Sequence, residues 1–464
     1  MIPASRYKVC VVGLGPSGLG AAMTLSNLRG ASELVCLDQG EASGNRTCSV
    51  LQNGICKRET PCQMICGFGG CSLLSGGKVS AFPAGTKLAT ILGDDCKADR
   101  KLKEAINMLN TFLPLEKTER EQAKLNMARE LFERMGFVYK YFDVYQFDHE
   151  ELREAYVRIH SQLRSAGVSV LLNTKLMDVY QEEHGFSLKV RQDGTEFIIV
   201  TEYLILGLGR SGESILERVN THLDLGGKGG QLDIGVRIEF PTHLFPPVAW
   251  YHGDLKLLFK NARTFCVCKD GSIAPYVIDG VFFTEGHLSL TNSTGLTNLG
   301  IIRRYEPSDT NRILLEGIRG RAIQQRRGKL VCQRLTEYLN RTSTVAEASM
   351  SQRNSNSFCV WGDVNNAFPA SIATEVREAV LYFAQRLLPR QHWEEVRVFA
   401  PEVEYAGLSF LVKPNFSIRQ GFYVIGDSVG QFRGIAQAFC SGIICAENLI
   451  GHGYDQIFEK NIHI

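Results

Sequence analysis

Three glycines near the beginning of the chain have a spacing that suits close contact with phosphates. They follow the apolar run YKVCVV (7–12) and open a segment with helical spacing, so backbone N–H groups at the start of the helix can face a pyrophosphate. Asp38 ends the next apolar run, 25 residues after Gly13, where its carboxylate can accept a hydrogen bond from a ribose hydroxyl. A glycine turn that only packs a helix on a strand is the weaker alternative. The residues expected to form this nucleotide turn are Gly13, Gly15, Ser17 and Gly18.

A second set of residues, near the other end of the chain, favours FAD over NAD. An apolar run ends at Asp427, and a helix-forming segment is expected to follow from Ser428 onward. Flavoproteins similar to glutathione reductase place such an aspartate on the ribityl chain, and the helix N-terminus that follows stabilises negative charge on the reduced flavin. This resemblance implies FAD as the cofactor, and the alternative is an aspartate that only caps the helix. The cofactor contacts expected here are Gly426, Asp427, Gly434 and Ile435.

A second G-x-G-x-x-G pattern occurs at Gly207, Gly209 and Gly212 and also follows an apolar run. It would suit a separate nicotinamide-binding domain, but no acidic strand end follows at the expected distance in the loop-rich segment after it. We therefore expect Gly207 and Gly209 to form a second nucleotide-contacting turn of the same FAD domain.

The glycine-rich segment from Cys66 to Lys78 is expected to border the flavin, since Gly69 and Gly70 let the backbone approach a planar ring closely. Cys66 and Cys71 have the spacing of a redox-active pair, but disulfide reductases also need a nicotinamide domain and a C-terminal His–Glu pair, and neither is visible. Lys78 is the candidate for contact with the flavin or an anionic substrate, and a solvated lysine is the alternative.

Arg433 is the second catalytic candidate. It lies between Asp427 and the helix expected to point at the flavin, where a guanidinium could hold a carboxylate or phosphate in bidentate fashion. The alternative is an arginine that faces solvent or pairs with a surface acid such as Glu447.

Two further pairs each alternate along an expected strand and therefore share a face. Arg237 and Glu239 form one pair, and Cys266 and Cys268 form the other. Either pair could line the cavity. A structural ion pair and buried thiols are the respective alternatives.

The elements that must position these residues predict an α/β fold. A discontinuous Rossmann-like FAD-binding domain is expected in three parts, with a helical insertion and a second, mixed β-rich α+β substrate domain. The FAD domain would occupy residues 1–94, 141–215 and 401–464. The insertion would occupy residues 95–140 and the substrate domain residues 216–400.

Composition limits the classes of function. The 464 residues are 44% hydrophobic and 22% charged with a net charge of +2, which is ordinary globular composition and argues against a nucleic-acid partner. Neither a signal peptide nor an apolar run long enough to span a bilayer is visible, so a cytoplasmic location is expected. The 14 cysteines do not repeat metal-binding spacings, and we expect free thiols, no structural disulfides and no metal.

Four segments read in order carry a more specific resemblance: CGFGGCSLLSGGK, QLDIGVRIEFP, NARTFCVCKDGSIAP and GFYVIGDSVGQFRGIAQAFCSGIICAENL. With them the chain resembles a largely uncharacterised bacterial family of FAD-dependent dehydrogenases over most of its length. The resemblance implies two domains and non-covalently bound FAD. The sequence departs from the family at Cys71 and Gly77, after the serine of GRSGES, and at Gln431, Phe432 and Arg433, which indicates a specialised active site.

The function expected is an FAD-dependent dehydrogenase or oxidase that takes a hydride from a small organic substrate, which Arg433 would favour in anionic form. A flavin reductase or monooxygenase reduced by NAD(P)H is one alternative. A flavin-containing redox or interaction protein, with a protein partner, is an alternative of another class. The sequence does not fix the oligomeric state.

Overall fold

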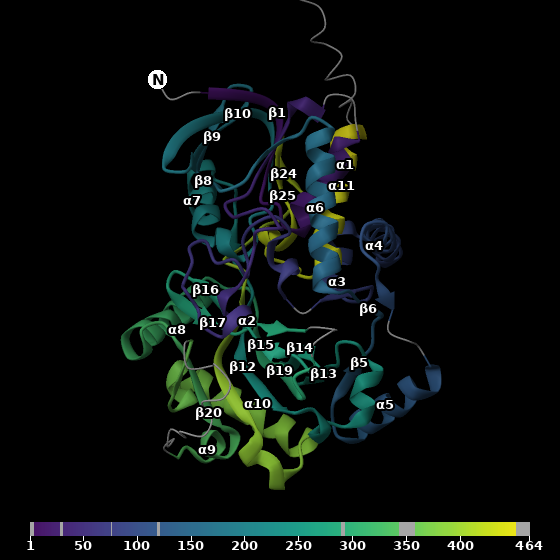
Figure 1. Ribbon diagram of the computed structural model, residues 1–464, viewed down its shortest axis with the longest axis vertical. Helices are drawn as coiled ribbons and strands as arrows, with labels where there is room; N and C mark the ends of the chain where they lie inside the picture. The colour runs from purple at the N-terminus through teal and green to yellow at the C-terminus, as the bar shows by residue number, and fades with distance from the viewer. Residues whose placement is uncertain are drawn as a thin grey trace, which may run out of the picture.

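The computed structural model describes residues 4–27, 31–75, 77–117, 121–288, 293–342 and 358–451. The described elements form two bodies stacked along the long axis, each built on an eight-stranded sheet (Figure 1). None of the helices in these ranges combines the length and the apolar character needed to cross a bilayer.

The upper sheet is the Rossmann-like one, because its central strands are parallel and come from distant parts of the chain. Its order is β24-β25-β10-β1-β2-β7, and β1 pairs in parallel with both β10 and β2. The β8–β9 hairpin leads antiparallel into β10. Apolar residues fill these central strands, as expected for a sheet covered on both faces. The strands are β1 (Ala4–Val12), β2 (Leu34–Leu37), β7 (Ser169–Leu171), β8 (Thr174–Glu182), β9 (Gly185–Gln192), β10 (Thr195–Leu206), β24 (Ser417–Arg419) and β25 (Phe422–Val424).

Helices cover one side of this sheet, and the β8–β9 hairpin with one helix lies on the other (Figure 1). Two of the covering helices, α1 and α11, cross at backbone contact. A Cβ added at Gly20 would lie 2.3 Å from the carbonyl oxygen of Phe439, and one added at Gly442 would lie 2.0 Å from that of Ser17. Only glycine allows this crossing. The helices are α1 (Pro16–Ser26), α6 (His149–Ser165), α7 (Glu213–Leu223) and α11 (Ile435–Leu449).

The lower sheet is mainly antiparallel, with the order β21-β20-β22-β12-β19-β14-β13-β5. A fully buried ion pair between Arg237 and Glu402 links its central strands at 2.6 Å. The strands are β5 (Val138–Lys140), β12 (Leu232–Pro241), β13 (Lys256–Phe259), β14 (Ala262–Cys268), β19 (Leu296–Tyr305), β20 (Leu330–Arg334), β21 (Cys359–Trp361) and β22 (Arg397–Tyr405). The helices of this body are α8 (Thr310–Arg326), α9 (Leu335–Asn340) and α10 (Ala370–Leu387).

The helical insertion expected over residues 95–140 contains α4 (Asp95–Asn110) and α5 (Gln122–Arg134). The helix α4 lies beside α11, where Lys101 pairs with Glu447 at 3.0 Å, whereas β5 extends the lower sheet. The insertion therefore connects the two bodies. The domain boundaries proposed above stay a prediction.

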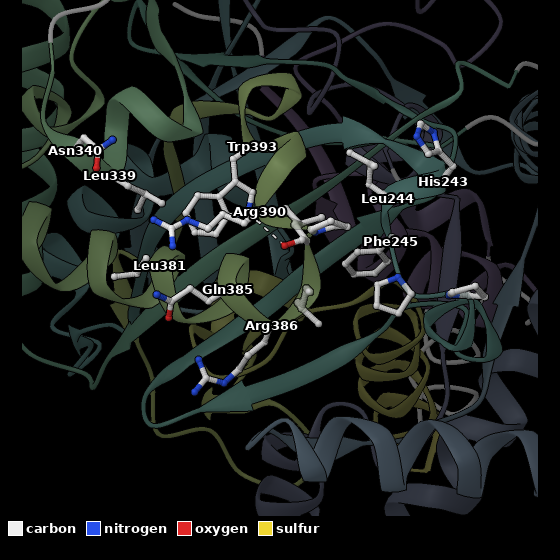
Figure 2. A pocket seen from close by; sticks show the side chains of 15 residues that line it. His243, Leu244, Phe245, Leu339, Asn340, Leu381, Gln385, Arg386, Arg390 and Trp393 are labelled. Atoms are coloured by element: carbon white, nitrogen blue, oxygen red, sulfur yellow. Dashed lines mark hydrogen bonds between the residues drawn. The ribbon is translucent and has the colours of Figure 1, made fainter.

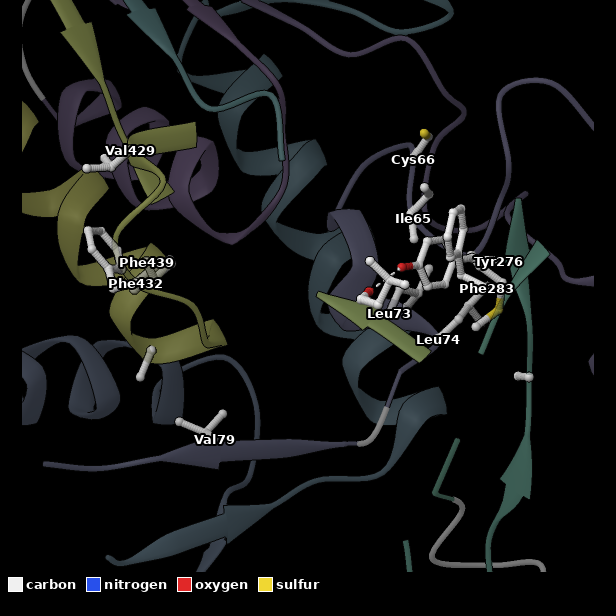
Figure 3. Packing of buried hydrophobic residues seen from close by; sticks show 14 of the residues in the cluster. Ile65, Cys66, Leu73, Leu74, Val79, Tyr276, Phe283, Val429, Phe432 and Phe439 are labelled. Carbon is white, nitrogen blue, oxygen red and sulfur yellow. Dashed lines mark hydrogen bonds between the residues drawn. The ribbon is translucent and has the colours of Figure 1, made fainter. Parts of the chain in front are cut away.

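An apolar contact also joins the bodies. Ile65, together with Leu73 and Leu74 of the glycine-rich segment, lies beside Tyr276 and Phe283 of the lower body (Figure 3). The remaining short elements are α2 (Ser49–Asn53), α3 (Thr86–Leu92), β3 (Lys78–Ser80), β4 (Glu116–Lys117), β6 (Val144–Gln146), β11 (Lys228–Gly229), β15 (Ser272–Ile273), β16 (Tyr276–Ile278), β17 (Val281–Phe283), β18 (Gly286–His287) and β23 (Leu408–Ser409).

Candidate active site

A cavity of about 470 Å³ lies between the two bodies, and nearly every residue singled out in the sequence borders it or supports its wall. Its upper wall contains the turns after β1, β10 and β25 together with Asp38. Its lower wall contains Asp254, Lys256, Phe265 and Cys266. A cavity of this size, at the carboxyl ends of parallel strands, is where α/β proteins bind ligands.

The turn between β1 and α1 depends on its glycines. Gly13 has a φ of +94°, and a Cβ there would lie 2.2 Å from the carbonyl oxygen of Gly207. A Cβ on Gly18 would lie 1.8 Å from the carbonyl oxygen of Gly13. The helix begins after Gly15 with no side-chain cap and no acidic residue in its first turn, so its first N–H groups remain available to an anion.

Asp38 lies at the end of β2 and binds backbone rather than solvent. Its carboxylate accepts hydrogen bonds from the N–H groups of Leu14 at 2.8 Å, Gly40 at 2.9 Å and Gly67 at 2.9 Å. A carboxylate accepts about four hydrogen bonds, so one position is left for a ribose hydroxyl. Asp38 therefore fixes the nucleotide turn to the glycine-rich segment and still lines the cavity.

The second and third turns meet the first at Ser17. A Cβ on Gly207 would lie 2.8 Å from the Ser17 hydroxyl, and one on Gly426 would lie 2.6 Å from it. The N–H of Gly209 donates to the Ser428 hydroxyl at 3.3 Å. Because β10 pairs directly with β1, the second glycine pattern follows a strand of the same sheet as the first.

The glycine-rich segment packs against the same turn. A Cβ on Gly70 would lie 2.8 Å from the Cα of Gly15, and one on Gly69 would lie 2.4 Å from the ring of Tyr156. The segment thus passes over the β1–α1 turn at a distance that larger residues would prevent.

Asp427 is half-buried in a single 3-10 turn, Gly426–Val429, that follows β25. Burial raises the pKa of its carboxyl, and the nearby Arg210 guanidinium opposes this rise. The helix starts at Ile435 and not at Ser428 as expected, because Gly430 (φ +76°) and Gly434 (φ +114°) interrupt it. The uncapped start of α11 lines the cavity.

Lys78 and Arg433 border the cavity, but each is bound to a carboxylate. Lys78 pairs with Asp254 at 3.2 Å, and although burial alone would lower the pKa of Lys78, the Asp254 charge raises it above its ordinary value. Arg433 pairs with the buried Glu404. The surface pairing with Glu447, weighed above as the alternative, is wrong, since that carboxylate binds Lys101 on the outside of α11.

Arg433 belongs to a charge network that the sequence did not reveal. Arg210 pairs with Glu285 at 2.9 Å and with Glu404 at 3.0 Å, and Arg433 shares Glu404 with it. Burial, together with the charge of Arg210, lowers the pKa of Arg433 to about 10. The two arginines and two glutamates balance one another, so this wall of the cavity carries little net positive charge.

Lys256 is a functional candidate that the sequence analysis missed. It lines the cavity, and its Nζ donates to the carbonyl oxygen of Thr264 at 3.1 Å. Burial, reinforced by the charge of Arg263, lowers the pKa of Lys256 to about 7. Buried lysines with such a pKa act as proton acceptors in catalysis. Nothing in the run KLLFK distinguishes this lysine from a surface one.

Cys66 and Cys71 border the cavity, but neither is an activated thiol. Burial raises the pKa of Cys66 to about 12 and that of Cys71 to about 11. Both thiols are therefore protonated at neutral pH, which is opposite to the state needed for thiol exchange.

A larger hollow of about 840 Å³ lies on the lower body (Figure 2). It shares no residue with the glycine turns, and no carboxylate lines it. Two of its polar groups have structural partners: Trp393 donates to the carbonyl oxygen of Leu388 at 3.3 Å, and Arg386 lies 3.6 Å from the centre of the Tyr382 ring. The cavity at the glycine turns is the better candidate site.

The chain matches no protein-family model and no curated protein. Among solved structures it is similar to a p-nitrophenol 4-monooxygenase from Pseudomonas putida, with 12% identity over 98% of this chain and 81% of that chain and a TM-score of 0.40. A geranylgeranyl bacteriochlorophyll reductase-like protein from Thermoplasma acidophilum gives 11% identity over 99% and 84%, with a TM-score of 0.39. A glycine oxidase from Geobacillus kaustophilus gives 14% identity over 95% and 94%, with a TM-score of 0.35. At these values the cofactor and the reaction have to be argued from the site itself.

Proposed function

We propose that this chain is an FAD-dependent oxidoreductase. The observation that carries the proposal is the meeting of three glycine turns, after β1, β10 and β25, at one cavity that two uncapped helix starts also reach. One sheet thus offers all three turns to a single extended ligand with a pyrophosphate between its two ends.

The residues fit FAD along its length. The start of α1 would hold the pyrophosphate, and Asp38 would hold a ribose hydroxyl. Asp427 would face the ribityl chain, and the start of α11 would stabilise negative charge on the reduced ring. Bound FAD would supply a ring that exchanges a hydride with the substrate.

The lower wall supports dehydrogenation or oxidation of a small substrate. When a hydride leaves a carbon that bears O–H or N–H, the proton on that heteroatom must also leave, and Lys256 is placed in the wall to accept it. The balanced charges around Arg210 and Arg433 modify the earlier expectation, since an anionic substrate would have to compete with Glu404 for Arg433.

The cofactor is tested by denaturing the purified yellow protein and identifying the released flavin by chromatography. FAD supports the proposal, whereas FMN, or NAD without flavin, refutes it. Asp427→Ala should lower the FAD content, and Leu411→Ala, at a side chain 92% exposed, serves as the matched control.

The direction of electron flow is tested by rapid mixing of the FAD-loaded protein with NADH and with NADPH. Slow or absent bleaching of the flavin by both is expected of a substrate dehydrogenase. Fast bleaching by either nucleotide would refute the dehydrogenase and support the flavin reductase or monooxygenase alternative. A protein partner without small-molecule turnover is the other class, and the cavity of about 470 Å³ beside the three glycine turns argues against it.

A further inference from the structure

Two cysteines in the lower wall of the cavity form an unusual pair. Cys266 and Cys268 lie on β14, where the pairing with β19 shifts register between Phe265 and Cys268. Cys266 has a φ of +44°, a left-handed conformation that is rare for a residue with a side chain. Such strain is retained where the surrounding structure enforces it, often at functional sites.

This bulge brings the two thiols together. Residues two apart on a regular strand lie about 6.7 Å apart. The Cys266 and Cys268 sulfur atoms are 3.8 Å apart, and both thiols are free. A disulfide would need them to approach by roughly a further 1.8 Å.

Cations surround the pair. Lys78 donates to the carbonyl oxygen of Val267, the residue between the two cysteines, and Asp254 accepts from the N–H of Val267 at 2.9 Å. On the other side, Arg237 donates to the carbonyl oxygen of Cys266 at 3.1 Å. The charges of Lys78 and Arg237 favour a thiolate at this place.

The two sulfurs differ in environment. The hydrogen bond between the two sulfurs lowers the pKa of the Cys268 thiol and raises the pKa of the Cys266 thiol. The charges of Lys78 and Arg237 also lower the pKa of Cys268, whereas burial opposes this effect. Cys268 is fully buried, whereas Cys266 lines the cavity. One thiolate and one thiol, with one member open to the ligand, is the arrangement that thiol exchange requires. Cys66 and Cys71 lack it.

We propose that Cys266 and Cys268 are a redox-active dithiol that exchanges two electrons with the cofactor of this site. The inference rests on the proposed function, because it needs FAD in the cavity. In the forward direction the Cys266 thiol and the Cys268 thiolate together lose one proton and two electrons, and a sulfur–sulfur bond forms. The flavin would be reduced by the two electrons and would take up the proton. Reduced flavin would reverse the step.

The test counts reducing equivalents. FAD-loaded protein is oxidised with diamide, desalted and titrated anaerobically with dithionite while the flavin absorbance is followed. The wild type should consume about twice the equivalents per FAD that Cys266→Ser or Cys268→Ala consumes. Cys445→Ala is the matched control, because this buried cysteine lies on α11 outside the cavity, and it should titrate like the wild type. Equal consumption by the wild type and both cavity variants would overturn the dithiol.

A second readout separates this proposal from the FAD proposal. Trypsin releases both cysteines in one peptide, TFCVCK, between Arg263 and Lys269. In the diamide-treated protein this peptide should have lost two hydrogens and should resist alkylation, and an alkylated peptide would overturn the pairing. A protein that forms this disulfide but holds no FAD would refute the proposed function and the electron exchange, while the pairing of the thiols would stand.

Discussion

The crossing of α1 and α11 permits a quantitative test by Gly442→Ala. The new Cβ would lie 2.0 Å from the carbonyl oxygen of Ser17 and 2.7 Å from the nitrogen of Ala21. Real Cβ contacts essentially never fall below 3.0 Å, so the two helices must separate by about 1 Å. The obstructing atoms are backbone, so no side-chain rotation relieves the contact.

The magnitude follows from two opposed terms. Alanine is better than glycine in a helix by about 1 kcal/mol. Overpacking costs roughly 1–3 kcal/mol, and rigid backbone contacts place this site at the upper end. We therefore expect Gly442→Ala to destabilise the protein by about 2 kcal/mol, or roughly 4–8 °C in melting temperature for a domain of this size. Since Ser17 lies in the first turn of α1, FAD affinity should fall as well.

The matched control is Gly320→Ala in α8, where a Cβ would meet no atom within 4 Å. The same exchange there should raise stability by up to about 1 kcal/mol, because only the helix propensity changes. The assay is thermal unfolding of both variants with and without FAD, together with a fluorescence titration of FAD. If the two variants melted alike and bound FAD alike, the close crossing would not constrain the site and the reasoning would be refuted.

Three further predictions concern single side chains. Lys256→Met should stabilise the protein most at pH 7 and below. Because the folded-state pKa of Lys256 is lowered to about 7, the free energy of unfolding of the wild type rises by about 1.4 kcal/mol per pH unit between pH 7 and about pH 10. A difference in unfolding free energy between variant and wild type that did not change with pH, measured by denaturant unfolding, would contradict this. Arg237→Met should cost about 3–5 kcal/mol by leaving Glu402 charged and buried, and adding Glu402→Gln should recover part of the loss in the same unfolding assay. Asp38→Asn should cost about 1–3 kcal/mol and release FAD, since an amide nitrogen cannot accept the backbone hydrogen bonds, and full FAD retention would argue against its role.

The local parts of the fold could be predicted from the sequence. The pattern around Gly13 follows an apolar run directly, so strand, turn and helix are fixed within about twenty residues. The amphipathic spacing of the segment HEELREAYVRIHSQLRS likewise predicts a helix, and the structure contains it as α6. The second glycine pattern could be assigned to the same sheet because the acidic strand end of a second dinucleotide domain is missing after Gly212.

The charge partners could not be predicted, because they depend on tertiary placement. Asp254 reaches Lys78 only once β14 of the lower sheet lies under the glycine-rich segment. Glu404 reaches Arg433 from β22, a strand of the other body. Spacing along the chain contains no information about such pairs, and the burial that lowers the pKa of Lys256 is equally non-local.

The insertion of the lower body into the upper sheet has a consequence for biosynthesis. The strand β25 pairs with β10 across a long separation in the chain, with Leu204 opposite Phe422, and every strand of the lower sheet except β5 lies between them in the sequence. During translation the lower body can fold while β10 still has an open edge, and its folding shortens the loop that β25 must close. The third glycine turn and α11 join the sheet only afterwards. A cofactor that contacts all three glycine turns can therefore bind only after the lower body has been synthesised.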